Sequence, residues 1–283
     1  MDLDHAAVVV ADLDRGQAAF ARLGFRLTPR SSHRGPVPGR GMADLGSGNH
    51  CAMFAQGYFE VLGITDPAGY KPHLDRRLGR YEGLHLVAFG TRDAVAEVAG
   101  LRARGVAVGD PEELGRDVPC GDGTRPGRFA IANLDPGTYP EADFIVIEQK
   151  TREVLWQPAL LDQPNGVTGL ARVTLVATDR DAALARLAPV LGPARGGRFA
   201  LVPGEVEVIG QGEVAARLPG CALPGPAPCG AAVAFTAADL GRTRAWLAGA
   251  GVAVLADDGG TILVGPEWGC GAAVEFVQEG TAE

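Results

Sequence analysis

An interval of 19 or 20 residues recurs four times in this chain of 283 residues, and each time it runs from an apolar strand to a glycine. The strand leads to an aspartate that can begin a helix, and an Ala-, Leu- and Arg-rich segment of helical spacing follows. The closing glycine suits a left-handed helix cap. The intervals are His5–Gly24, His85–Gly105, Arg172–Gly192 and Ala231–Gly251, and the helix-starting aspartates are Asp12 or Asp14, Asp93, Asp181 and Asp239. A repeated supersecondary unit is therefore the first expectation for the fold.

Short apolar runs divided by Gly, Pro and Asp follow each expected helix, and they are typical of a small antiparallel meander. Cys51–Phe54 followed by Tyr58–Leu62 is one clear pair of such runs. Each unit reads strand–helix–strand–strand–strand, so we predict an α+β fold of four βαβββ modules arranged as two pairs. We place the first pair at residues 1–150 and the second at 168–283. The proline-containing join between them includes Trp156, which we expect to pack on a domain.

Composition excludes several classes of partner. A formal net charge of −8 without a basic run argues against a nucleic-acid backbone, because that needs clustered Lys and Arg. The amino terminus enters a short apolar strand that resembles neither a signal peptide nor a membrane span. The five cysteines form an odd, widely spaced set without a CxxC motif, as expected for free thiols in a reducing cytoplasm. We therefore expect a cytoplasmic protein that binds a small molecule.

Two histidines and two glutamates recur at corresponding places in the first two modules. His5 and His85 lie in first strands, and Glu60 and Glu148 lie in last strands. All four interrupt β-branched, apolar runs, where a charged side chain needs a partner that offsets its desolvation. One divalent ion bound by two imidazoles and two carboxylates supplies that partner. The ligand set suits Zn, Ni, Co, Fe or Mn without choosing among them.

Several stretches carry a resemblance to a known family. They are Leu3–His5 with Asp12–Asp14, Leu23–His33, Gly48–Phe54 with Gly57–Ile64, and Trp156–Pro158 with Gln163–Gly166. Together with the modules they resemble the vicinal oxygen chelate superfamily, which includes glyoxalase I, bleomycin-resistance proteins and extradiol dioxygenases. Within it they look like the bacterial glyoxalase-like domain proteins. The resemblance implies a cleft in each pair of modules and, in the first pair, the glyoxalase I ligand order His5, Glu60, His85 and Glu148.

Four protein ligands in an octahedral field leave two open positions, which two adjacent substrate oxygens can fill. We therefore predict a metal-dependent, glyoxalase-I-like lyase or isomerase that acts on a small substrate, with Glu148 or Glu60 as general base. A ring-cleaving dioxygenase is one alternative, and it requires a facial triad of two histidines and one carboxylate. The other alternative is a protein that sequesters a small molecule without catalysis.

Four further residues are candidates for contact with the substrate. Asn49 begins an apolar strand, and His33 lies in a Gly- and Pro-rich segment. Arg125 and Arg128 can hold a substrate carboxylate through paired hydrogen bonds.

The second pair of modules has different residues at the corresponding positions. Its first strands carry Arg172 and Ala231 (or Gly230), and its last strands carry Glu207 and Glu275. Arginine is not a metal ligand at neutral pH, so we expect an ion pair between Arg172 and Glu207 and no metal. We expect this half to serve as scaffold, lid or dimer surface, and a homodimer is one arrangement compatible with it.

Overall fold

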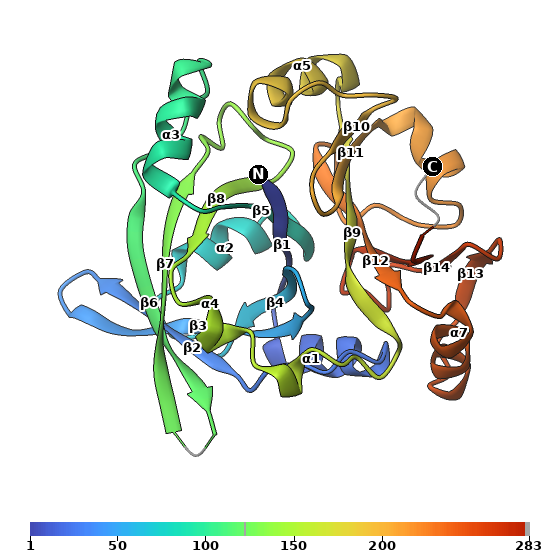
Figure 1. Ribbon diagram of the computed structural model, residues 1–283, viewed down its shortest axis with the longest axis horizontal. Coiled ribbons are helices and arrows are strands. Elements are labelled where there is room, and N and C mark those ends of the chain that lie inside the picture. The colour runs from blue at the N-terminus through green and yellow to red at the C-terminus, as the bar shows by residue number, and fades with distance from the viewer. Residues whose placement is uncertain (122, 281–283) are drawn as a thin grey trace.

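The protein is described by a computed structural model that covers residues 1–121 and 123–280, so the last three residues of the predicted second domain lie outside it. In this part of the chain the strands form two curled sheets that lie side by side (Figure 1). The first sheet has the order β2-β3-β4-β1-β5-β8-β7-β6 and the second β10-β11-β9-β12-β15-β14-β13.

The strands of the first sheet are β1 (Asp2–Val10), β2 (Ser31–Val37), β3 (Gly41–Met53), β4 (Tyr58–Ile64), β5 (Gly83–Thr91), β6 (Glu112–Cys120), β7 (Gly123–Asn133) and β8 (Asp143–Gln149). Those of the second are β9 (Val167–Ala177), β10 (Arg198–Ala200), β11 (Glu205–Gly210), β12 (Cys229–Ala237), β13 (Val254–Asp257), β14 (Thr261–Val264) and β15 (Ala273–Gln278). The helices are α1 (Leu13–Arg22), α2 (Pro72–Leu78), α3 (Ala94–Ala103), α4 (Arg152–Leu155), α5 (Arg180–Leu191), α6 (Val214–Arg217) and α7 (Leu240–Gly249), with 3-10 turns η1 (Pro158–Leu160) and η2 (Gln211–Glu213).

This arrangement confirms the predicted fold of four βαβββ modules in two pairs. The third module has one strand fewer after its helix within residues 167–228, all of which are described. Aspartates cap the four main helices: Asp12, Asp93, Asp179 and Asp239 accept backbone N–H groups of the first turn. The expectation of Asp181 as the third cap was wrong, because Asp181 lies inside the first turn of α5.

One hydrophobic core joins the two halves. The faces of both sheets that carry α1, α3, α5 and α7 contribute to it, and Phe25 meets Phe235 across the halves with ring centroids 4.7 Å apart. On β1 the side chains of Ala6, Val8 and Val10 enter this core, so His5 and the residues at period two from it lie on the opposite, inner face of the sheet.

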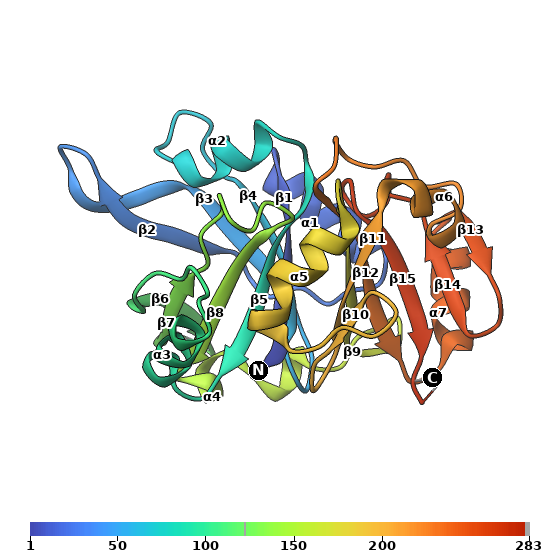
Figure 2. The same cartoon turned by 90° about the horizontal axis from the view of Figure 1, so that it is seen from above.

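The inner face of the first sheet is covered. Helix α2 lies across it and buries Leu74 against Val9 and Leu62 (Figure 1). Residues 152–161, which contain α4 and η1 and which we call the strap, cover the other end through Leu155. The hairpin of β2 and β3 projects away from the body (Figure 2).

Two observations bear on the sequence-based expectations about compartment and partners. All five cysteines carry free thiols. In the described residues, every helix is too short or too polar to span a bilayer.

Candidate functional site in the first-half cleft

The four modules can be aligned residue by residue through their helix caps. Seven residues before the caps stand His5, Leu86, Arg172 and Ala232. Strand pairing agrees with this alignment, since His5 pairs with Ala88 as Ala7 pairs with Leu86 in the antiparallel pair of β1 and β5. Leu86 therefore stands in the second module where His5 stands in the first.

The last strands align in the same way. Glu60 pairs with Ala7, and the equivalent pairs are Ile145 with Ala88, Glu207 with Thr174 and Glu275 with Ala234. The predicted equivalence of Glu207 and Glu60 agrees with this register. Glu275 corresponds to Ile145 rather than to Glu148. The first-half cleft is thus defined by His5, Glu60, Leu86 and Ile145, and the second-half cleft by Arg172, Glu207, Ala232 and Glu275.

His5 lies on the inner face in a hydrogen-bonded setting and is 3% exposed. Its Nδ1 donates to Asp4 Oδ1 at 2.6 Å, and its ring stacks on Tyr58 with centroids 4.2 Å apart. The Tyr58 hydroxyl lies 3.4 Å from His5 Nε2. Gln149 donates to the same Asp4 oxygen at 3.0 Å, so Gln149 is the residue of β8 that reaches this centre.

His85 occupies a bulge in β5, at the position where β1 places Asp4 in a bulge of its own. Its ring stacks on Tyr81 with centroids 4.0 Å apart, and Nε2 donates to the Tyr81 carbonyl at 2.8 Å. Burial lowers the pKa of His85 to about 4. The structure therefore corrects its assignment as the counterpart of His5, because His85 is equivalent to the bulge residue Asp4 and Leu86 is equivalent to His5.

Glu148 lies on the helix-bearing face of β8, the face of Phe144 and Val146, which enter the shared core. Its Oε2 accepts the backbone N–H of Ala94 at 3.0 Å in the first turn of α3. The assignment of Glu148 as an inward-facing ligand and base is corrected for this reason: successive strand residues face opposite sides, and Gln149 takes the inner one.

A chain of side chains crosses the first-half cleft from one module to the other. Asn49 donates through Nδ2 to Glu60 Oε1, and Asn49 Oδ1 accepts from Arg116 Nη1 at 2.6 Å. Glu60 is 9% and Asn49 3% exposed. Cys51 lies beside this chain, and burial raises the pKa of its thiol to about 12, so it is a thiol rather than a nucleophile.

The remaining candidates divide between the cleft and the surface. His33 Nδ1 lies 3.1 Å from Ser47 Oγ, and its pKa is lowered by burial and by the Arg116 charge, partly opposed by Glu60. Arg125 and Arg128 are both exposed on β7, and neither guanidinium has a hydrogen bond or ion pair within the described residues. The structure brings His33 and Asn49 to the cleft and leaves both arginines outside it.

Arg116 is the cleft residue that the sequence analysis missed. It lies on β6, the strand paired with β7, and shares the inner face with Val118. The alternation of Arg116, Val118 and Cys120 along β6 is the sequence signal that marks the inward side.

The donor set does not fit a four-ligand metal site. Two of the four equivalent positions, Leu86 and Ile145, are hydrocarbon side chains packed with Ala7 and Ala88. Over residues 1–121 and 123–280, no three His, Cys, Asp or Glu side chains gather as a metal site requires. His5 and Glu60 are the two predicted ligands that face this cleft.

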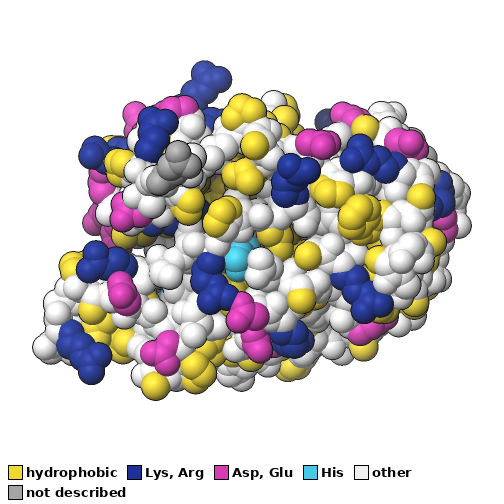
Figure 3. Space-filling model, turned by 90° about the horizontal axis from the view of Figure 1, so that it is seen from below, with side chains coloured by type: hydrophobic (Ala, Val, Ile, Leu, Met, Phe, Trp, Pro, Cys, Tyr) yellow, Lys and Arg dark blue, Asp and Glu magenta, His cyan; other side chains and the backbone are white. Residues whose placement is uncertain are grey.

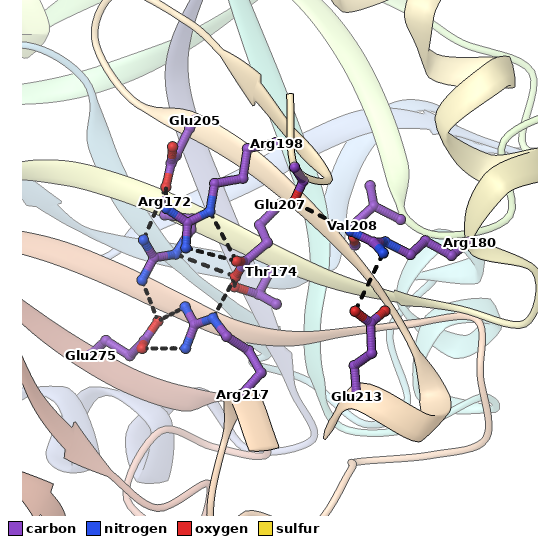
Figure 4. A network of polar contacts seen from close by, with 11 residues as sticks. Arg172, Thr174, Arg180, Arg198, Glu205, Glu207, Val208, Glu213, Arg217 and Glu275 are labelled. Atoms are coloured by element: carbon purple, nitrogen blue, oxygen red, sulfur yellow. Dashed lines mark hydrogen bonds and ion pairs between the residues drawn. The ribbon is translucent and has the colours of Figure 1, made fainter. Parts of the chain in front are cut away.

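The second-half cleft holds a network of three arginines and three glutamates (Figure 4). Arg172 contacts Glu205 at 2.9 Å, Glu275 at 3.0 Å and Glu207 at 3.5 Å, which confirms the predicted pairing with Glu207. Arg217 pairs with Glu207 and with both oxygens of Glu275. This network lies at the floor of an open cavity of about 1390 Å³.

Charges of both signs are mixed on the face of the molecule shown in Figure 3. Lys and Arg side chains are dispersed there among acidic and hydrophobic ones. A backbone of phosphates is bound by clustered positive charge.

Comparison with known proteins shows the family to which this chain belongs. A family model described as a glyoxalase-like domain matches residues 3–191. No curated protein matches the chain. A hypothetical protein from Staphylococcus aureus is similar in structure, at 11% identity over 98% of both chains with a TM-score of 0.66. A mutant of 4-hydroxymandelate synthase from Streptomyces coelicolor is 15% identical over 100% of this chain and 93% of that chain, with a TM-score of 0.59.

Proposed function

Because this chain belongs to the glyoxalase-like domain family, within the vicinal oxygen chelate superfamily, we propose that it is an isomerase or lyase. The reaction is a proton transfer on a small, oxygen-rich substrate in the first-half cleft. The observation that carries this proposal is the buried hydrogen-bonded chain from Glu60 through Asn49 to Arg116. It supplies a carboxylate, a group that orients it and a cation at one place.

Each side chain of this chain has a role in the proposed reaction. Glu60 removes a proton from the substrate carbon and returns it, since a positioned carboxylate in a dry site is an effective base. Asn49 holds that carboxylate in one orientation through its Nδ2 donor. The positive charge of Arg116 stabilises the negative charge that develops on a substrate oxygen. His5 is held in place by its hydrogen bond to Asp4, and its Nε2 is a second atom that can accept or donate a proton.

Members of the superfamily commonly bind a divalent metal, and the sequence predicted one here. The proposed reaction has no step on a metal, because Leu86 and Ile145 occupy two of the four donor positions. The dioxygenase alternative meets the same obstacle, since its triad requires two histidines and one carboxylate. His5 and Glu60 supply one of each.

A non-catalytic binding protein is the second candidate. The open cavity of about 1390 Å³ in the second half favours it, because a ligand can enter there without displacing any segment. Binding without turnover would support this candidate over the first.

The proposal is tested by following deuterium incorporation. The protein, treated with a chelator or supplied with metal, is incubated in D₂O with small 2-oxo acids, 2-hydroxy acids and 2-oxoaldehyde–thiol adducts, and exchange at carbon is measured by NMR. Glu60→Gln should lower the exchange rate by about 10²–10⁴, the usual contribution of general base catalysis. Glu148→Gln is the matched control and should leave the rate unchanged.

Other outcomes decide between the alternatives. Loss of exchange in Glu148→Gln with full exchange in Glu60→Gln contradicts the assignment of the base. Oxygen uptake with catechols would establish a dioxygenase instead. Exchange that disappears with the chelator and returns with one equivalent of metal would restore the metal-dependent mechanism.

A further inference from the structure

Arg116 carries a positive charge in the first-half cleft and is linked to the nearby Glu60 carboxylate only through Asn49. Its guanidinium is half-buried, and its hydrogen bonds go to the neutral groups of Asn49 and Cys51. In the described part of the chain, no carboxylate lies within ion-pair distance of Arg116. A guanidinium has five N–H donors, so most of its hydrogen-bonding capacity is free for another molecule.

The arginines of the second-half cleft show what a structural guanidinium looks like in this fold. Arg172, Arg198 and Arg217 each pair with two or three glutamates. Withdrawing a cation from water is costly unless an anion compensates it. The arginines of the second cleft contact carboxylates directly, whereas Arg116 is linked to Glu60 only through Asn49, so the anion expected in direct contact with Arg116 comes from outside the chain.

A cavity lies directly against this cation. It has a volume of about 20 Å³ and is lined by Arg116, Tyr58, Ser31 and Thr28, with Leu155 and Gln157 of the strap above it. This is room for one water molecule. A carboxylate is larger than one water, so a ligand at Arg116 must displace part of the strap, which favours a small ligand.

We propose that Arg116 binds the carboxylate of a small monocarboxylate substrate and supplies in this cleft the positive charge that a divalent metal supplies elsewhere in the superfamily. The inference rests on the proposed function and names its substrate class. The planar N–H pair matches the two carboxylate oxygens. Glu60 takes a proton from the carbon next to the substrate carbonyl, which is the methyl carbon of pyruvate. A C=C bond forms as the C–H bond breaks, and the carbonyl electron pair moves onto the carbonyl oxygen beside Arg116; the carbonyl forms again when Glu60 returns the proton.

Pyruvate is the probe for this site, and its neutral methyl ester is the control for carboxylate recognition. Binding is measured by calorimetry and by ligand-observed NMR in the full-length, chelator-treated protein at constant ionic strength. We expect Arg116→Met to weaken pyruvate binding at least tenfold, the range of a lost hydrogen bond to a charged group. Arg116→Lys should bind at an intermediate level, because it keeps the charge but loses the planar pair.

Arg128→Gln is the matched control, since Arg128 lies on the neighbouring strand and is exposed; its affinity should equal that of the parent. Without ligand, Arg116→Met should unfold at a denaturant concentration no lower than the parent, because it removes an unpaired cation. A purely structural arginine would destabilise the protein when removed. Equal binding of pyruvate and methyl pyruvate, or unchanged pyruvate affinity in Arg116→Met, overturns the inference.

The same variants separate this inference from the proposed function. Deuterium exchange that needs Glu60 but persists in Arg116→Met would leave the proton transfer standing and refute the carboxylate site. Pyruvate binding that depends on Arg116 while no substrate exchanges would leave the site standing and refute the isomerase or lyase.

Discussion

The two clefts of this molecule are built from equivalent strands, but they carry different polar and charged side chains at the equivalent positions. In the first, two of four equivalent positions keep polar side chains, His5 and Glu60, and the cation comes from Arg116 on another strand. In the second, Arg172 occupies the position of His5, and Glu207 and Glu275 surround its guanidinium. The difference lies in how the cations are paired: directly with glutamates in the second cleft, and only through Asn49 in the first.

The two clefts also differ in how far they are covered: the cleft of Arg116 is covered, and the cleft with the arginine–glutamate ion pairs is open. The first-half cleft is covered by α2 and by the strap, and the cavity beside Arg116 is about 20 Å³. The second-half cleft is open, with about 1390 Å³ above its ion-pair network. Coverage of the first cleft keeps water away from Glu60, which strengthens electrostatic interactions there.

The largest expected effect concerns the second cleft. Glu275→Gln keeps the shape of the side chain but leaves Arg172 and Arg217 with too few anions, so it should lower the free energy of unfolding by roughly 3–5 kcal/mol. Urea denaturation measures this. Glu205→Gln is the control in the same network, because Glu205 is the more exposed partner of Arg172, at 26%, and should lose less than about 1 kcal/mol. Equal losses in the two variants would mean that the network is not a structural unit.

The second effect tests whether His85 is structural. Its pKa is about 4 in the folded protein, against 6.5 for the ordinary imidazole, because it is buried. The folded state therefore favours neutral His85, and this stabilisation is present above pH 6.5 and lost as the pH falls toward 4. The loss should reach up to about 3 kcal/mol.

NMR titration of the imidazole signals and urea denaturation at several pH values measure it. His85→Gln should flatten the dependence, apart from the part that comes from His73, whose pKa is also lowered to about 4 by burial. An imidazole signal of His85 that titrates near pH 6.5, or that shifts when zinc is added, would return His85 to the list of candidate ligands.

The smallest effect tests the alignment of the modules. Leu86→His combined with Ile145→Glu places the missing pair of donors opposite His5 and Glu60. Zinc in about hundredfold excess over its Kd should then stabilise the variant by about 2.7 kcal/mol, the value that mass action gives. The unfolding midpoint with and without zinc measures it.

Leu86→His combined with Ile147→Glu is the matched control, one pleat further along the same face. It should gain less from zinc. If zinc stabilises the unchanged protein equally, the parent already binds metal and the alignment is contradicted.

Much of the architecture could be predicted because it depends on local pattern. The interval from strand to glycine identified the modules, and the aspartates identified three of the four helix starts. Glu207, which we placed at the position corresponding to Glu60, has the equivalent strand partner in the structure. The site was harder, since both first strands have a bulge at the equivalent position, and His85 is the bulge residue of β5 whereas His5 follows the bulge residue of β1.

The sequence by itself determined the repeat and the two pairs of modules, because the periods of strands and helices are visible in neighbouring residues. It also showed where polar residues interrupt the expected strands and loops, at His5, His33, Asn49 and Glu60. Only the tertiary structure decided which of these side chains meet. The strand register places Glu148 on the helix-bearing face of β8, and it places Arg116 of β6 beside Asn49 of β3. The reason is physical: side-chain direction depends on hydrogen-bond register between strands far apart in the chain, and one inserted residue reverses it.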